Sequence, residues 1–503
     1  MEEKNIVQRK PLRIWRWSIL TTIIILCLFV TSWAVILQVT NKRLPITNAT
    51  NTHTTTTGDT MQKKAPQDLY IGYNDVMYRI SGRDGSVIWH HALQQPSKMN
   101  RIIGSSMQVH IMNDALVCVV LEHTFYVLRR SDGEELWHYA VLLTPAQQAE
   151  TRASIMDVFF DKNQVYVDFS SGEIAAMDMQ TGALKWKETK FPNGASFSAD
   201  DGTLYATSST ANGNTVVYAF DGATGQERWH FTREMWGNVS FNPPIIVNGV
   251  LYAGGNPLYA LNAQTGKKLW EQRLPDRSRY FDNLQLMGGV LYANSAATIA
   301  AVGSVGGMGA QNPPDIWRVF AFDVQTGNPL WHSPAGYQLL DGGTVTDGLI
   351  VAQSVIPEQD QQEKFLALDS KNGSVRWQIT LASLPCDSDE ACSPHQVQIA
   401  GQRLYALDYS HLQVFDLLNG QRLALYAVTL PARKSFGPSV LNDGILYVRS
   451  AVHEGGAYSS GSSNTFWLYT IHAVRLSDGA TVWEYHVGKL REYQDPISEM
   501  YVA

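Results

Sequence analysis

One pattern of apolar and polar positions recurs along the chain and predicts short paired strands. Four or five apolar residues are followed by a turn segment, often begun by Asp, Asn or Ser, that ends in Gly, and then by a second short run that closes with Trp. The stretch LYALNAQTGKKLW at 258–270 is one copy. The apolar run is typical of a strand buried on both faces, and the Gly suits a turn residue with positive φ. Each copy of this thirteen-residue phrase therefore predicts a β-hairpin.

The phrase occurs nine times, with no insertion inside it, at 77–89, 125–137, 174–186, 217–229, 258–270, 319–331, 365–377, 412–424 and 471–483. Gly fills its ninth position in every copy, as Gly85, Gly133, Gly182, Gly225, Gly266, Gly327, Gly373, Gly420 and Gly479. Trp closes eight copies, as Trp89, Trp137, Trp186, Trp229, Trp270, Trp331, Trp377 and Trp483. Ala424 closes the copy at 412–424. These positions account for eight of the chain's 14 Trp, so the repeat is not a coincidence of composition.

Another strand with its own turn signal precedes each phrase, for example NGVLYAG at 248–254, and a further apolar run such as PPIIV at 243–247 precedes several of these strands. The repeating unit is therefore four antiparallel strands, A to D in chain order, of which C and D form the phrase. The closing positions lie 41 to 61 residues apart, which matches the blade of a β-propeller. A ring of such sheets buries each apolar face against a neighbour. We interpret the closing Trp as structural side chains that dock one blade on the next, and the Gly as structural turn residues.

The phrase resembles the pyrroloquinoline-quinone (PQQ) repeat, which builds the propellers of quinoprotein alcohol dehydrogenases and of the non-enzymatic lipoprotein of the outer-membrane barrel-assembly machine. The resemblance covers about 67–503 and implies an all-β propeller of PQQ-like repeats. Propellers of this family usually have eight blades, whereas nine phrases are present, so eight or nine four-stranded blades are expected. The first phrase lacks an obvious strand A. The C-terminal stretch PISEMYVA at 496–503 is a candidate for this strand and for closing the ring.

The N-terminal 66 residues differ in kind from the rest. No charged residue occurs within 17–41, and this almost wholly apolar stretch is long enough to span a bilayer as one transmembrane helix. A cleaved signal peptide would have a shorter apolar region, so we expect an uncleaved anchor. Five basic residues precede the stretch and two follow it closely, which predicts a cytoplasmic N-terminus at 1–16. The Thr-rich segment 42–66 is expected to be a flexible stalk, and 67–503 an extracytoplasmic propeller.

Charge and cysteine content add two constraints. The formal net charge is −7, with no basic block outside the first 43 residues, so nucleic-acid binding has no support. Cys118 falls in a predicted strand and is interpreted as a small core residue. Cys386 and Cys392 share one loop, where a local disulfide is expected outside the cytoplasm, although a metal site there is the alternative.

The longest loops predict where a partner would bind. Long D–A connections are expected at about 141–154, 187–200, 271–284 and 379–396, and long B–C connections at 301–315 and 453–465. In an up-and-down blade these two kinds of loop emerge on one face, and long loops on a rigid scaffold commonly bind ligands. Drift in unconstrained loops is the alternative. We expect a protein, peptide or glycan partner on this face.

Two functions remain open from the sequence. The first is a membrane-tethered, non-catalytic propeller that acts as a binding or assembly scaffold, with no catalytic residue, no metal and no cofactor. The second, implied by the resemblance, is a PQQ-dependent quinoprotein dehydrogenase that oxidises alcohols or sugars with Ca²⁺ beside the quinone. The chain lacks the adjacent Cys pair of the alcohol dehydrogenases and is shorter than they are. These departures favour the scaffold.

Overall fold

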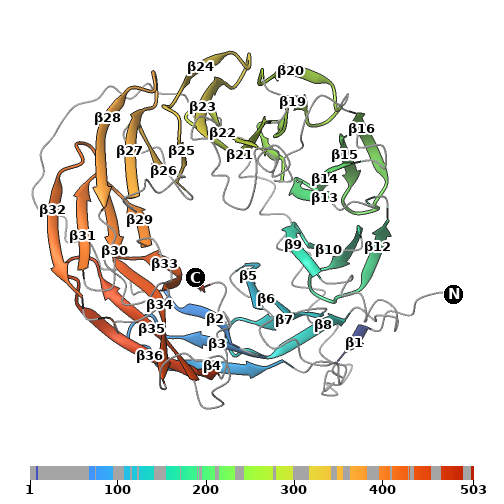
Figure 1. The fold of residues 1–503 in the computed structure, drawn as a ribbon. Helices are drawn as coiled ribbons and strands as arrows, with labels where there is room; N and C mark the ends of the chain where they lie inside the picture. The colour runs from blue at the N-terminus through green and yellow to red at the C-terminus, as the bar shows by residue number, and fades with distance from the viewer. Residues whose placement is uncertain are drawn as a thin grey trace, which may run out of the picture. The chain divides into compact units, whose positions relative to one another are not determined.

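The computed structural model describes residues 7–9, 67–73, 75–93, 107–113, 116–121, 124–140, 155–169, 172–189, 191, 195–209, 215–232, 243–275, 279–297, 317–340, 348–354, 363–381, 396–407, 411–428, 430, 436–454, 466–490 and 500–502. Within these residues the strands form nine antiparallel sheets that follow one another around a ring (Figure 1). The fold is therefore the predicted all-β propeller, and its blade number equals the number of phrases.

Each blade is a sheet with its first strand innermost and its last strand outermost. The first blade comprises β37 (Met500–Val502), β2 (Leu69–Tyr73), β3 (Val76–Ile80) and β4 (Val87–Ala92). The second blade comprises β5 (Met107–Ile111), β6 (Leu116–Leu121), β7 (Thr124–Arg129) and β8 (Glu135–Ala140), and the third comprises β9 (Ile155–Asp161), β10 (Gln164–Phe169), β11 (Glu173–Asp178) and β12 (Leu184–Glu188). The fourth comprises β13 (Ala195–Asp200), β14 (Thr203–Ser209), β15 (Thr215–Asp221) and β16 (Glu227–Thr232). The fifth comprises β17 (Ile245–Val247), β18 (Val250–Ala253), β19 (Leu258–Asn262) and β20 (Lys268–Gln272).

The remaining four blades repeat this order. The sixth blade comprises β21 (Arg279–Met287), β22 (Val290–Ala297), β23 (Arg318–Asp323) and β24 (Pro329–His332), and the seventh comprises β25 (Tyr337–Leu339), β26 (Leu349–Ser354), β27 (Glu363–Asp369) and β28 (Val375–Leu381). The eighth comprises β29 (Gln396–Ala400), β30 (Arg403–Leu407), β31 (His411–Asp416) and β32 (Arg422–Ala427). The ninth comprises β33 (Phe436–Asn442), β34 (Ile445–Glu454), β35 (Phe466–Arg475) and β36 (Thr481–Leu490). Three strands of the ninth blade, β34 to β36, have 10 residues each and are longer than any strand of the blades before it.

The ring closes through the C-terminal strand. β37 pairs with β2 in the register Ile71↔Met500, Tyr70↔Tyr501 and Leu69↔Val502, which confirms the expectation that the C-terminal stretch supplies the missing innermost strand. Every pair of consecutive blades shares an apolar cluster, and the cluster that contains Met500 joins the ninth blade to the first. The apolar core is therefore a series of seams between sheets.

The closing Trp of a phrase lies in the seam toward the following blade. Each indole Nε1–H donates to the main-chain oxygen of the sixth residue in the next phrase, over 2.7 to 3.1 Å. The pairs are Trp89–Arg130, Trp137–Met179, Trp186–Gly222, Trp229–Ala263, Trp270–Val324, Trp331–Ser370, Trp377–Leu417 and Trp483–Gly82. The last pair connects the ninth blade to the first, so one contact repeats across the point of closure.

The Gly of the following phrase packs against the ring of the same Trp. All nine phrase Gly have φ between 67° and 73°, in the left-handed region that favours glycine. A Cβ on Gly266 would lie 2.5 Å from the Trp229 ring. The indole therefore packs against a turn that has no side chain at this position, and seven other seams repeat the arrangement.

The seam between the eighth and ninth blades is different because Ala424 occupies the Trp position. A Cβ on Gly479 would meet Cβ of Tyr426 at 2.5 Å, two residues after Ala424. Tyr426 thus contacts the turn that an indole covers elsewhere, and no Tyr426 hydrogen bond equivalent to that of the Trp is formed within the described residues. The phrase alone did not indicate this replacement.

Some of the expected boundaries and segments differ from the structure. Two predicted loops contain innermost strands, since β13 lies within 187–200 and β21 begins within 271–284, so those boundaries were wrong. The structure adds β1 (Val7–Arg9) to the outer edge of β8, a strand that the sequence did not predict. The predicted anchor and stalk lie outside the described residues. Among the helices of the described part, none is long and apolar enough to cross a membrane.

Candidate binding site on the channel wall

The site residues predicted from sequence fall into two groups. The docking Trp and the turn Gly lie in the seams between blades, as described above. Cys386 and Cys392, together with the loops 301–315 and most of 453–465, lie outside the described residues, so their disulfide and partner roles stay predictions. Cys118 is fully buried, and burial raises the pKa of its thiol far above the ordinary value. This thiol is therefore an inert core group.

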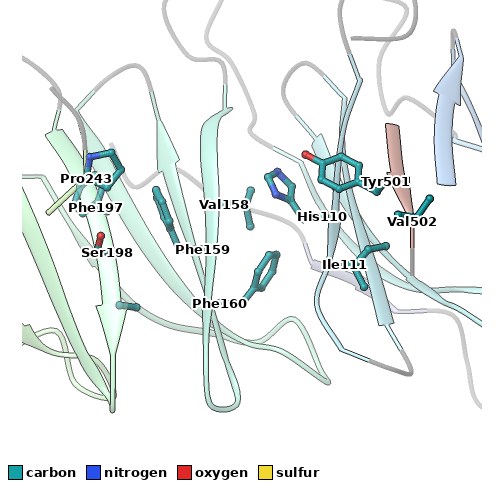
Figure 2. A pocket seen from close by; sticks show the side chains of 11 residues that line it. His110, Ile111, Val158, Phe159, Phe160, Phe197, Ser198, Pro243, Tyr501 and Val502 are labelled. Atoms are coloured by element: carbon teal, nitrogen blue, oxygen red, sulfur yellow. The ribbon is translucent and has the colours of Figure 1, made fainter. Parts of the chain in front are cut away.

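A hollow of about 590 Å³ lies along the innermost strands of the first four blades. Figure 2 shows its wall, in which β9 stands between β13 on one side and β5 with β37 on the other. The lining residues are His110, Ile111, Val158, Phe159, Phe160, Phe197, Ser198, Ala199, Pro243, Tyr501 and Val502. They come from the innermost strands of four blades and from the residues just before β17, so the hollow lies on the inner side of the ring, which we call the channel side.

Aromatic side chains dominate this wall. The His110 ring lies 6.4 Å from Tyr501 and 6.0 Å from Phe160, measured between ring centroids. On the other side of β9, Phe159 lies 6.1 Å from Phe197. All of these separations are within the range in which aromatic rings attract one another. The hollow is therefore bordered by two adjoining groups of rings.

The local sequence of β9 explains how both groups arise. Successive side chains of a strand point to opposite faces, so Phe159 and Phe160 enter different seams. Phe160 packs against the cluster shared with the second blade, and Phe159 against the cluster shared with the fourth. Most innermost strands of the other blades have no such pair of adjacent Phe. Two consecutive Phe on an innermost strand thus place an aromatic ring in the wall on each side of β9.

Two further contacts fix the ends of the hollow. The Ser198 hydroxyl donates to the main-chain oxygen of Pro244 over 2.6 Å, which ties β13 to the residues that precede β17. The pairing of Tyr70 with Tyr501 holds the Tyr501 ring beside β5. The C-terminal strand therefore closes the ring and also supplies part of the wall.

A pair of carboxyl groups lies next to the hollow. Asp168 in β10 is opposite Asp157 in β9, the residue that directly precedes Val158. Asp168 is only 7% exposed, and its burial, followed by the neighbouring Asp157 charge, raises the pKa of Asp168 to about 7. The main-chain N–H of Phe169 opposes this shift. Near pH 7 the Asp168 carboxyl is therefore protonated in about half of the molecules.

The chemistry of the described lining is mainly apolar and aromatic. Among the described residues the lining of the hollow offers flat apolar rings, one imidazole, one phenol and the Ser198 hydroxyl, but no carboxylate, thiol, Lys or Arg. In the part of the chain that the structure describes, no group of three or more His, Cys, Asp or Glu could hold a metal ion. Such a surface recognises apolar or aromatic groups by burial and ring stacking.

Sequence reasoning missed this site for a definite reason. The lining residues come from strands that are far apart in the chain, and each contributes only two or three side chains. The single available signal was the pair Phe159–Phe160 in VFFD, where the alternation of a half-buried strand would place only one large apolar residue.

Comparison with known proteins agrees with the architecture. A family model described as outer membrane protein assembly factor BamB matches residues 60–231 and 212–485. The serine/threonine-protein kinase AfsK of Streptomyces griseus is 26% identical over 281 residues, which are 48% of this chain and 32% of the kinase. The chain thus spans about a third of the length of that curated relative.

Two solved structures match about two thirds of the chain. BamB from Moraxella catarrhalis is 15% identical, with a TM-score of 0.43, covering 69% of this chain and 96% of that one. The quinohemoprotein alcohol dehydrogenase from Comamonas testosteroni is 14% identical, with a TM-score of 0.42, covering 69% and 71% respectively. At these identities the similarity concerns the fold alone.

Proposed function

The chain belongs to the family described as outer membrane protein assembly factor BamB, and on this premise we propose that it is a non-catalytic propeller that binds a protein partner on its channel wall. The observation that carries the proposal is the aromatic hollow bordered by β5, β9, β13 and β37. Its volume and its rings suit apolar side chains of another polypeptide. The family name refers to the assembly of other proteins, which agrees with a protein ligand.

The partner that this wall fits best is an extended segment with aromatic or aliphatic side chains. The rings occur on both sides of β9, so successive side chains of a ligand would meet apolar surface along the wall. Within the sheets of the described part, each of β5, β9, β13 and β37 pairs with a neighbouring strand on one side, so a bound segment would lie along the other edge. A bound segment could therefore combine apolar contacts with main-chain hydrogen bonds.

Binding measurements on wall variants test this proposal. Phe160→Ser removes a ring from the wall, and we expect affinity for a Phe- and Leu-rich extended peptide to fall about tenfold, since a buried aromatic contributes a few kcal/mol at an interface. Leu269→Ser is the control, because Leu269 is 50% exposed on β20, an outermost strand. Equal affinities for the two variants would contradict the assignment of the wall as the binding surface.

We also propose that residues 17–41 anchor the chain in a membrane, with 42–66 as a stalk and the propeller outside the cytoplasm. Support comes from the uncharged apolar stretch and its basic flank. Protease added to spheroplasts should release a fragment that begins within 44–66. A fully protected propeller would reverse the orientation, and a fragment that retains residues 7–9 would favour the placement of β1 beside β8.

The PQQ-dependent dehydrogenase remains the alternative that the repeat itself suggests. The described wall does not fit the quinone well, because its lining has no metal-ligand set and no Lys or Arg for the quinone carboxylates. We therefore expect no dye reduction when the propeller is given PQQ, Ca²⁺ and an alcohol or aldose. Calcium-dependent dye reduction would replace the scaffold with an enzyme.

A further inference from the structure

One seam of the ring is built differently from the others. Where eight seams hold an indole against a phrase Gly, the seam between the eighth and ninth blades has Ala424 and the smaller contact of Tyr426 with Gly479. Aliphatic residues of both blades fill the rest of this seam, among them Leu412, Val448 and Val474.

Three side chains of the ninth blade, Ser450, His472 and Glu484, form a row of hydrogen bonds that faces this seam. Nε2 of His472 in β35 lies 2.7 Å from the Ser450 hydroxyl oxygen in β34, and its Nδ1 lies 3.0 Å from a carboxylate oxygen of Glu484 in β36. A carboxylate can only accept, so Nδ1 donates to Glu484, and Nε2 of the neutral ring accepts from Ser450. The order Ser–His–Glu resembles a hydrolytic triad. Ser450, however, is 1% exposed, so no substrate can reach its hydroxyl.

The strand register places these side chains on the side of the eighth blade. His472 is opposite Val448, which belongs to the cluster of this seam, and it alternates with Ile471 and Ala473, which belong to the seam with the first blade. Glu484 is opposite His472 in the adjoining strand. The imidazole is therefore enclosed between two blades, and it is fully buried.

Few ionisable groups surround this imidazole. From β36 the same face carries Glu484, His486 and Lys489, of which His486 accepts or donates a hydrogen bond with Thr470 over 3.0 Å. The eighth blade contributes Tyr405 and Tyr426. Residues 431–435 lie outside the described part. Glu484, whose side chain is 41% exposed, is the one carboxylate within hydrogen-bond distance among the described residues.

Protonation of His472 would change both the bonding and the charge of the seam. A protonated imidazole has two N–H donors and no acceptor, so Nε2–H would donate to the Ser450 oxygen, and the Ser450 hydroxyl hydrogen would have to turn toward another acceptor. A positive charge would also enter a mainly aliphatic interface, where only Glu484 opposes it. Burial lowers the pKa of His472, and the hydrogen bond to Glu484 partly offsets this shift.

We propose that the seam between the eighth and ninth blades is an acid-sensitive joint, which loosens on protonation of His472 before the seams that hold Trp. A histidine with a lowered pKa in the fold favours the folded state fully above its ordinary value of 6.5, and this contribution is lost as the pH falls below 6.5. Because Ala424 replaces Trp, the same seam also lacks the indole that packs against the phrase Gly in the other eight seams.

Hydrogen–deuterium exchange of the full chain at pH 7.5 and 5.5, expressed as protection factors, tests the joint. Peptides from β31, β32, β34 and β35 should lose about tenfold protection at pH 5.5, the scale of a local opening. Peptides from β23 and β27, at the Trp331 seam, should keep theirs. No loss at pH 5.5, or an equal loss at both seams, would overturn the proposal.

Two variants identify the titrating group. His472→Gln can donate to Glu484 and accept from Ser450 but does not titrate, so its protection should be the same at both pH values. His486→Gln, the matched control, should keep the tenfold loss. Exchange of the histidine C2–H in the unmodified chain measures the pKa of His472 without any substitution. A pKa at or above 6.5 would overturn the proposal, and so would a pKa too low for any protonation at pH 5.5; a pKa between these limits would support it.

Discussion

At the scale of the residue, the phrase Gly has two separable reasons to lack a side chain. Gly266 has φ of 67°, and a Cβ there would also meet the Trp229 ring at 2.5 Å. Gly249 has φ of 76° but no atom within 4 Å of the same position. Both residues therefore have a left-handed backbone conformation, but only Gly266 is also in contact with a Trp ring.

This difference predicts unequal costs for the same substitution. Gly249→Ala should cost about 1 kcal/mol of unfolding free energy through the left-handed backbone alone. Gly266→Ala should cost about 2–4 kcal/mol, because the indole must also move. Urea unfolding of both variants measures the difference, and equal losses would show that the Trp229 contact does not stabilise the seam.

The Asp157–Asp168 pair predicts a stability that falls as the pH rises. The pKa of Asp168 is raised to about 7 by burial and by Asp157, so its contribution is complete below about pH 4 and is lost as the pH rises to 7. Asp168→Asn should stabilise the protein at pH 8 by about 1–3 kcal/mol and by little at pH 4. Asp201→Asn, at an 89% exposed carboxyl, is the control. A destabilised Asp168→Asn at pH 8 would contradict the assignment.

At the scale of the element, most strands of the ring could be predicted because each phrase carries two coincident signals, the turn Gly and the closing Trp. The innermost strands were harder. ASFSAD in β13 and RYFDNLQLM in β21 are rich in polar residues, since an innermost strand has a neighbour on one side and the channel on the other. They therefore look like loops in the sequence.

The C-terminal strand gives a prediction at this scale. Removal of 496–503 deletes the innermost strand of the first blade and Met500, which is 6% exposed in the seam with the ninth blade. Unfolding free energy should fall by at least about 2–5 kcal/mol, the range for removal of one buried Met side chain. Removal of Ala503 alone leaves the paired residues 500–502 in place and should have little effect. An unchanged midpoint after the longer truncation would show that β37 does not close the ring.

At the scale of the whole molecule, the repeat predicted the propeller but not its binding surface. Counting phrases left eight or nine blades open, of which the structure has nine, whereas the hollow depends on which side chains four separate inner strands turn toward the channel. The sequence also directed attention to the long loops and to Cys386 and Cys392, which lie outside the described residues. The fold is thus encoded in a repeated local pattern, and the candidate site in departures from it, such as the adjacent Phe159 and Phe160.

Photo-crosslinking in the native host tests the central claim, that the channel wall binds a protein, most directly. A photoreactive phenylalanine analogue would replace Phe160 in the wall and, separately, Leu269 on the outer strand β20. We predict a discrete crosslinked polypeptide from position 160 that is absent from position 269 and that is lost when excess Phe- and Leu-rich peptide is added. Adducts from position 269 alone, or from neither position in cells that fold the protein normally, would contradict the account.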